Sequence, residues 1–282
     1  MENAKIIAIA NHKGGTGKTT TTYNLGFALA SEGKKVLLID NDPQSNLTTV
    51  FGATTPEGVL TLDKTLALLL DEQELPVRDM YILHGNSFDL IPSCLDLSAT
   101  EINMRNELGS DKILSSLLEP LRSYYDYMLI DTNPALGMLT INALAACDSV
   151  IIPASPQLWS ATGLTALLDI ILKVKKRINS RITVSGILIT MTAEHTLLYR
   201  EAMDLLGEYF GGKIGVFGAK IPQSVSVGRA NFYSKSVMDF EAKNKAASAY
   251  SALAKEVIDN GGVCKNSGET QAEQSERSAD AQ

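Results

Sequence analysis

The sequence is organised around one stretch, Asn11-His12-Lys13-Gly14-Gly15-Thr16-Gly17-Lys18-Thr19-Thr20. A short apolar run at residues 6–10 precedes it, and a helical pattern that contains Leu25, Phe27 and Leu29 follows it. A buried strand, a glycine-rich loop and a helix in this order form the context that a phosphate-binding loop requires. The stretch therefore predicts a strand–loop–helix unit that binds an anion.

The glycines of this loop, Gly14, Gly15 and Gly17, let the backbone turn tightly and point its N–H groups at an anion, with no Cβ in the way. The following helix starts near Lys18, so the positive end of its dipole points at the same place. Lys18 can neutralise the β- and γ-phosphates of a nucleotide, and the Thr19 hydroxyl can bind Mg²⁺. A nucleotide phosphate group and Mg²⁺ are therefore the predicted ligands, and ATP is the nucleotide that the family resemblance described next implies.

The loop departs from the usual pattern G-x-x-x-x-G-K-[ST], because His12 stands where that pattern has its first glycine. It matches instead the variant K-G-G-x-G-K-T, in which the additional Lys13 is the signature. With this loop the sequence resembles the ParA/MinD family of P-loop ATPases, and the resemblance extends over roughly residues 4–259. The alternative is a plain glycine turn between a strand and a helix, and the length of the match in this context argues against it.

Two further apolar runs, at residues 34–40 and 125–132, end in acids and are typical of a parallel sheet that is buried on both faces. Ligands of such sheets bind at the carboxyl ends of the strands, so we expect these acids beside the phosphate loop. A lone Asp after a strand is more often a turn or helix cap, but the segment that starts at Asp40 also resembles the family's D-x-D-P-Q-x-N segment. The resemblance implies that Asp42 positions or activates the attacking water, that Asp40 lies near Mg²⁺ and that Asp131 reaches the Mg²⁺ shell through water.

Two later segments also carry the resemblance. Residues 133–144 resemble the family's second switch loop and its helix, but Asn133 stands where the family more often has a proline, which frees φ and adds a donor. Residues 220–226 match an I-P-x-x-V segment that lies near the adenine in the family. The ATP-binding residues implied by the resemblance are Lys13, Gly14, Gly15, Thr16, Gly17, Lys18, Thr19, Thr20 and Pro222.

The rest of the pattern predicts a single α/β domain. Strands are expected at 88–93, 149–154 and 183–190, and helices at about 61–70, 95–108, 162–174, 195–210 and 241–258. The alternation of strands and helices favours one doubly wound, mostly parallel sheet flanked by helices, the P-loop NTPase fold of the family. We expect the ATPase domain over residues 1–260 and a polar, disordered tail over 261–282, where almost no apolar side chain occurs.

The composition excludes several classes of protein. The 282 residues carry a net charge of −7, so any contact with a nucleic acid must come from a local basic patch. The three cysteines are scattered without C-x-x-C spacing, which fits a reduced cytosol and no structural zinc. The sequence contains no uninterrupted run of about 20 apolar residues, the length that a membrane span needs. The N-terminal apolar run is too short for a signal peptide. A cytoplasmic protein is the expectation.

The additional Lys13 is the residue from which the resemblance implies a mechanism. In the family, two ATP-bound subunits pack face to face and this lysine reaches the partner's phosphates, where a cation stabilises the charge of the transition state. The alternative is that Lys13 only neutralises its own loop. The resemblance implies Lys13, Lys18 and Asp42 as catalytic residues of a slow ATPase that is a homodimer in its ATP state.

The resemblance further implies a partition ATPase that moves a plasmid or chromosome. Its ATP dimer binds DNA without sequence preference on the nucleoid, and a centromere-binding, ParB-like partner protein stimulates hydrolysis. Because the phosphate loop begins near residue 11, we expect no DNA-reading domain before it. We hypothesise that the DNA patch contains Arg200, Lys220, Arg229 and Lys235, although each charge is more often only a solvated side chain.

Related ATPases with other tasks are the alternatives. A membrane-surface ATPase similar to MinD needs a C-terminal amphipathic helix, and the polar residues after Cys264 lack apolar anchors. An electron carrier similar to nitrogenase reductase needs cluster cysteines, and residues 131–144 contain none. A regulator that binds ATP without hydrolysis is disfavoured by the presence of both Lys13 and Asp42. An ATPase that positions a protein cargo shares every motif, so this alternative stays open.

Overall fold

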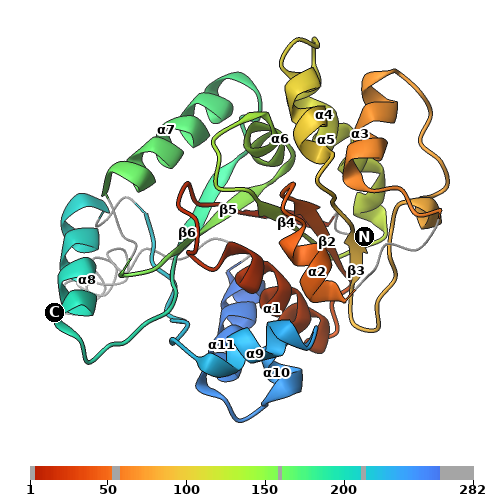
Figure 1. The fold of residues 1–282 in the computed structure, drawn as a ribbon. Helices are drawn as coiled ribbons and strands as arrows, with labels where there is room; N and C mark the ends of the chain where they lie inside the picture. Colours follow the sequence, from red (N-terminus) through yellow and green to blue (C-terminus); the bar gives the residue numbers. More distant parts are fainter. Residues whose placement is uncertain (1–3, 53–57, 158–160, 211–213, 261–282) are drawn as a thin grey trace, which may run out of the picture.

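The structure, a computed structural model, describes residues 4–52, 58–157, 161–210 and 214–260. Its centre is a six-stranded sheet in the order β3-β2-β4-β1-β5-β6 (Figure 1). The strands are β1 (Lys5–Ile9), β2 (Val36–Asn41), β3 (Asp89–Ile91), β4 (Tyr127–Thr132), β5 (Ser149–Ala154) and β6 (Thr183–Ile189). All five neighbouring pairs are parallel, which confirms the predicted doubly wound α/β sheet.

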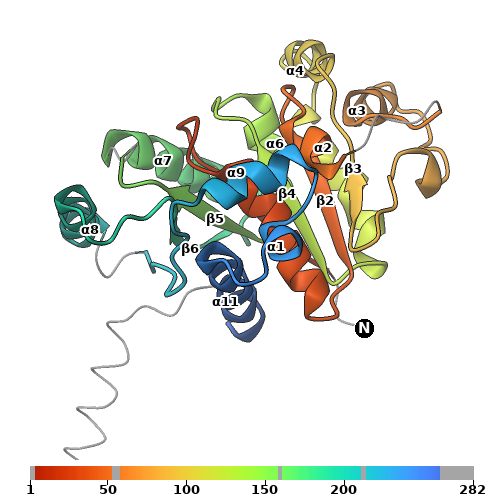
Figure 2. The same ribbon diagram turned by 60° about the horizontal axis from the view of Figure 1, so that its bottom comes forward.

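Helices cover both faces of the sheet (Figures 1 and 2). One layer contains α3 (Leu62–Leu70), α4 (Leu97–Met104), α5 (Ile113–Leu118), α6 (Met138–Ala146), α7 (Ala161–Arg177) and α8 (Leu197–Phe210). The opposite layer contains α1 (Lys18–Ser31), α2 (Asn46–Phe51), α9 (Val225–Phe232), α10 (Val237–Phe240) and α11 (Lys245–Asp259). Three 3₁₀ turns, η1 (Arg78–Met80), η2 (Ser110–Lys112) and η3 (Glu119–Ser123), complete the described elements.

The two layers explain why the strands are apolar throughout. Ile6 and Ala8 of β1 pack in the core under α3–α8, whereas Ile7 and Ile9 pack in the core under α1 and α11. Side chains alternate along a strand, so a sheet that is covered on both faces needs an apolar residue at every position. The same alternation runs through β2 and β4.

Two details of the sequence prediction need correction. The closing helix does not begin at residue 241; it begins at Lys245, because the Asn244 side chain accepts a hydrogen bond from the Ala246 N–H and caps it there. The short helices α2, α5, α9 and α10 were not predicted, because each is too short to show a helical period. The predicted tail at 261–282 lies outside the described residues.

The sheet topology brings the predicted site residues together. β4 lies between β1 and β2, and Asp40 at the end of β2 is the register partner of Asp131 at the end of β4. Ile9, the last residue of β1, is in turn the partner of Asp131. The phosphate loop and both acids therefore meet at the carboxyl ends of these central strands. No described helix is long and apolar enough to cross a membrane.

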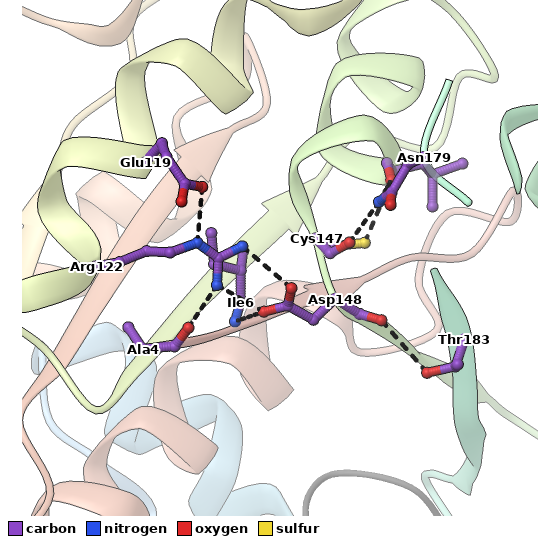
Figure 3. Close-up of polar contacts among 9 residues, drawn as sticks. Ala4, Ile6, Glu119, Arg122, Cys147, Asp148, Asn179 and Thr183 are labelled. Carbon is purple, nitrogen blue, oxygen red and sulfur yellow. Dashed lines mark hydrogen bonds and ion pairs between the residues drawn. The ribbon is translucent and has the colours of Figure 1, made fainter. Parts of the chain in front are cut away.

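At the amino ends of the strands, Arg122 connects the start of β1 to the start of β5 (Figure 3). Its Nη1 donates to the carbonyl of Ala4 at 2.6 Å and to Asp148 Oδ2 at 2.8 Å, and its Nη2 donates to Asp148 Oδ1 at 3.1 Å. Asp148 Oδ2 also accepts from the backbone N–H of Ile6 at 2.8 Å. The guanidinium is nearly buried, so its removal leaves a partly buried carboxylate and a backbone carbonyl without their partner.

We expect Arg122→Ala to lower the free energy of unfolding by about 3 kcal/mol, the size of effect seen when one member of a buried ion pair is removed. Urea unfolding followed by circular dichroism measures this. The matched control is Glu119→Gln, because Glu119 bonds to the same arginine but its side chain is 60% exposed. The control should cost less than about 1 kcal/mol. Equal losses for the two variants would contradict this account of the cluster.

Candidate nucleotide-binding site

The phosphate loop has the backbone that its glycines predicted. Gly15 and Gly17 have φ values of 74° and 84°, in the left-handed region that favours glycine. Asn11 holds one side of the loop, because its Nδ2 donates to the Pro153 carbonyl at 2.6 Å and its Oδ1 accepts from the Lys13 N–H at 3.0 Å. On the other side of the loop, the Thr190 hydroxyl donates to the carbonyl of Thr16 at 2.9 Å. The loop is therefore fixed by strands β5 and β6 as well as by its own turns.

Lys18 is the first residue of α1 and is buried inside the loop. Its Nζ donates to the carbonyl of Lys13 at 3.1 Å, so the ammonium lies within the arc of the loop. Burial lowers the pKa of Lys18, and the nearby charges of Asp131 and Asp42 oppose this shift. A cation held in this way is placed to meet a phosphate.

Two adjoining cavities, of about 480 and 290 Å³, open beside the loop and share Gly17, Thr20, Met191 and Asn231. The larger is lined by predicted nucleotide-binding residues and by Asp42, and the smaller by Pro222. The predicted residues that line them are Gly14, Gly15, Gly17, Lys18, Thr19, Thr20 and Pro222. Lys13 and Thr16 line neither cavity; the Thr16 side chain points inward and donates to the Lys13 carbonyl. The cavities suit phosphates at one end and a base at the other.

Sequence analysis missed Asn231, which comes from α9 and lines both cavities. Its Nδ2 lies 3.5 Å from the Thr20 hydroxyl, and its Oδ1 is buried with no hydrogen-bond partner in the described chain. A buried amide oxygen without a hydrogen bond destabilises the fold. A hydrogen-bond donor on a bound ligand would supply the missing partner. No signal in the sequence marked this residue, because it lies more than 200 positions from the loop.

The acids at the strand ends fit a divalent cation. Asp131 is fully buried; its Oδ1 accepts from the Thr22 hydroxyl at 3.4 Å, and its Oδ2 has no hydrogen-bond partner in the part of the chain described. Burial, and then the charge of Asp40, raise the pKa of Asp131 well above its usual range, and Thr19 and Lys18 oppose this shift. Mg²⁺ prefers such carboxylate oxygens, so the residues present fit this metal.

Asp40 is arranged differently from Asp131. Both of its oxygens accept hydrogen bonds within the chain, from the Thr48 N–H at 2.8 Å, the Thr48 hydroxyl at 2.7 Å and the Asp42 N–H at 3.3 Å. Asp40 thus anchors the start of α2, and the Thr48 contact is one that the sequence did not predict. Burial raises the pKa of Asp40 to about 6, although the Thr48 bonds oppose this shift.

A carboxyl group with a raised pKa stabilises the fold while it is protonated. Its contribution is complete below the unfolded pKa near 4 and is lost as the pH rises through about 6. In Mg²⁺-free solution we expect the stability of the wild type relative to Asp40→Asn to fall by about 3 kcal/mol between pH 4 and pH 7. Urea unfolding of both proteins across this range measures the difference. A difference that does not change with pH would contradict the prediction.

Asp42 lies on the cavity wall and is held by its own loop. Its Oδ1 accepts from the Gln44 N–H at 2.9 Å, and its carbonyl accepts from the Ser93 hydroxyl at 2.8 Å. The Ser93 N–H in turn donates to Thr48 Oγ1 at 3.0 Å. Sequence analysis assigned no chemistry to the segment after β3, but this segment positions the predicted catalytic acid.

The loop at residues 133–137, which resembles the family's second switch loop, contacts the phosphate loop and α6. The ring of His12 lies 3.1 Å from the carbonyl of Pro134 through Nδ1. Asn133, the departure from the family pattern, accepts from the Thr140 hydroxyl through Oδ1 at 3.0 Å. Asn133 therefore ties the loop to the helix that follows it.

Lys13 is half-buried, and its ammonium makes no hydrogen bond or ion pair within the described residues. Only its backbone groups bond to the loop. Its charge is therefore available to a group from outside the described chain.

The four predicted DNA contacts lie on separate elements. Arg200 is exposed on α8, next to the exposed Glu201, and Lys220 lies 5.6 Å over the Tyr199 ring. Arg229 on α9 lies 5.3 Å from the Phe240 ring, and Lys235 follows that helix. In Figure 1, α8 flanks β6 at the sheet edge, whereas α9 and α10 cover α1.

The fold and the site together define a P-loop nucleotide-binding protein. Residues 4–184 match the protein family described as an AAA domain. The chain is 37% identical over 257 residues to the sporulation initiation inhibitor protein Soj of Bacillus subtilis, covering 91% of this chain and 99% of Soj. It is 38% identical over 259 residues to the chromosome partitioning protein ParA of Caulobacter vibrioides, covering 90% and 94%.

Among solved structures, cobyrinic acid a,c-diamide synthase of Mycobacterium smegmatis with bound ATP analog and magnesium is similar, with a TM-score of 0.77 and 26% identity. The match covers 90% of this chain and 94% of that one. The chain belongs to the ParA/MinD family of P-loop ATPases. The predicted family and fold are confirmed.

Proposed function

We propose that this protein is an ATP-dependent dimerising ATPase for DNA partition. In its ATP state it binds DNA without sequence preference, and a ParB-like partner protein stimulates hydrolysis. The chromosome partitioning protein ParA of Caulobacter vibrioides, aligned over most of both chains, supports a partition ATPase. The observation that carries the proposal is the Lys13 ammonium, which has no partner in the described chain beside a loop that already holds Lys18.

Bound Mg²⁺ would supply charge neutralisation between the phosphates, held through Thr19 and Asp131 with Asp40 behind them. The chain's own residues do the remaining work. The backbone N–H groups of the loop and Lys18 bind the phosphates, and Asp42 orients the attacking water and accepts its proton. Lys13 of the second subunit places its charge on the transferred phosphate, so hydrolysis depends on dimerisation.

The experiment that tests the proposal is binding to arbitrary duplex DNA with ATP, with ADP and without nucleotide, each at two salt concentrations. Binding that requires ATP and weakens steeply with salt is the expected result, because counterions are released from phosphates. The dimer is measured in the same samples by light scattering. Charge reversal at Arg200 and, separately, at Arg229 identifies which surface contacts the DNA.

An ATPase that positions a protein cargo is the second candidate, and the charge of α8 favours it. Arg200 is followed on the exposed surface of this helix by Glu201, Asp204 and Glu208. An acidic surface repels DNA phosphates and attracts a basic protein. Dimerisation with ATP but no DNA binding in any nucleotide state would support this candidate against DNA partition.

A further inference from the structure

The first turn of α6 is held by two side chains that come from distant parts of the chain. Glu101, on α4, accepts a hydrogen bond from the backbone N–H of Leu139, with 3.4 Å between Oε1 and N. Asn41, at the end of β2, donates from Nδ2 to the carbonyl of the same Leu139 at 2.9 Å. The first N–H groups of a helix lack partners within the helix. A carboxylate there accepts a hydrogen bond from one of them and interacts favourably with the positive end of the helix dipole. The two side chains fix where α6 begins.

Gly137, the residue before α6, lies close to the Glu101 carboxylate. Its φ of −96° and ψ of −165° are extended values that any residue adopts. A Cβ at this position would nevertheless collide with the Glu101 carboxylate. The carboxylate is the end of a flexible side chain, so an alanine at this position would push it aside and cost it the contact with the Leu139 N–H.

The segment that leads into α4 also contacts the loop that contains Asp42. Ser93 donates through Oγ to the carbonyl of Asp42, and its N–H donates to Thr48. Residues 93–101 therefore contact the Asp42 loop at one end and the second switch helix at the other. Asn41 provides a second connection between the Asp42 loop and α6, because it lies next to Asp42 and contacts the same Leu139.

We propose that residues 93–101 couple the Asp42 loop to the second switch helix, with Glu101 as a positioning residue for the first turn of α6. The inference rests on the proposed ATPase cycle. A displacement of α6 carries Glu101 with it through the Leu139 contact and so shifts the segment that contains Ser93, and the two loops that face the nucleotide move together. Glu101 touches neither the nucleotide pocket nor Asp42; it acts through Leu139.

The test uses Glu101→Ala, Glu101→Gln, Gly137→Ala and the double variant Glu101→Ala/Gly137→Ala in the full chain. Hydrogen exchange without nucleotide, read in peptides over residues 136–141, reports on the start of α6. We expect exchange about 10-fold faster in Glu101→Ala and near the wild-type rate in Glu101→Gln, since an amide oxygen still accepts the bond. Glu107→Ala, an exposed acid just after α4, is the control and should change nothing.

Steady-state ATP hydrolysis is the second readout. Glu101→Ala and Gly137→Ala should each lower kcat by about 10-fold while KM for ATP stays within about 2-fold, because a misplaced switch slows the chemical step and leaves the phosphate loop intact. The double variant should be no slower than either single variant, because the methyl group added at position 137 then meets no carboxylate. Multiplying losses in the double variant, or unchanged exchange in Glu101→Ala, would overturn the coupling. A wild type that hydrolyses no ATP even with DNA and partner removes the proposed function, while the exchange result still decides the role of Glu101.

Discussion

Lys13→Gln should abolish ATP-dependent dimerisation and lower ATP turnover by at least about 100-fold, with ATP affinity within a few-fold of the wild type. The phosphates keep Lys18 and the loop backbone, so binding survives. Turnover is lost because the transition state lacks the second cation that would neutralise its charge. Light scattering, nucleotide binding and turnover separate these effects. Lys64→Gln, an exposed lysine on α3, is the matched control and should behave as the wild type.

Mixed subunits decide whether Lys13 acts on its own phosphates or on those of its partner. A Lys13→Gln subunit retains Asp42, and an Asp42→Ala subunit retains Lys13. If the lysine acts across the interface, a mixture of the two variants recovers part of the turnover that each lacks alone, because one of the two sites in the mixed dimer is complete. Lack of recovery, although mixed dimers form, would assign Lys13 to its own loop.

Asp42→Ala should lower turnover by at least about 100-fold and leave the ATP-bound dimer intact and long-lived. Asp42 lines the cavity beside the phosphate loop but does not form part of that loop, so the variant loses the group that orients water and keeps the groups that bind phosphate. The lifetime of the dimer after dilution into ATP-free buffer measures this. Asp71→Ala, an exposed acid after α3, is the control. Normal turnover in Asp42→Ala would remove the residue from the mechanism.

Much of the fold could be predicted because its signals are local. Each strand of the sheet is a short apolar run, and the long helices α7, α8 and α11 show an amphipathic period in the sequence. The short helices α2, α5, α9 and α10 were missed because short helices show no period. The start of α11 was misplaced by a few residues, because the Asn244 side chain caps the helix there. The start of α11 is set by one capping bond, and a single bond of this kind leaves little trace in composition.

The phosphate loop, its lysines and the acids at the strand ends could be predicted from local sequence, because each lies in a contiguous motif whose chemistry depends on neighbours in the chain. The residues that hold this motif in place are visible only in the folded chain. Asn41 meets Leu139 across 98 positions, Ser93 meets Asp42 across 51, and Asn231 meets Thr20 across 211. These hydrogen bonds exist only after the parallel strands have aligned their carboxyl ends, so isolated polar residues in the sequence carry no periodic sign of the partners they will find.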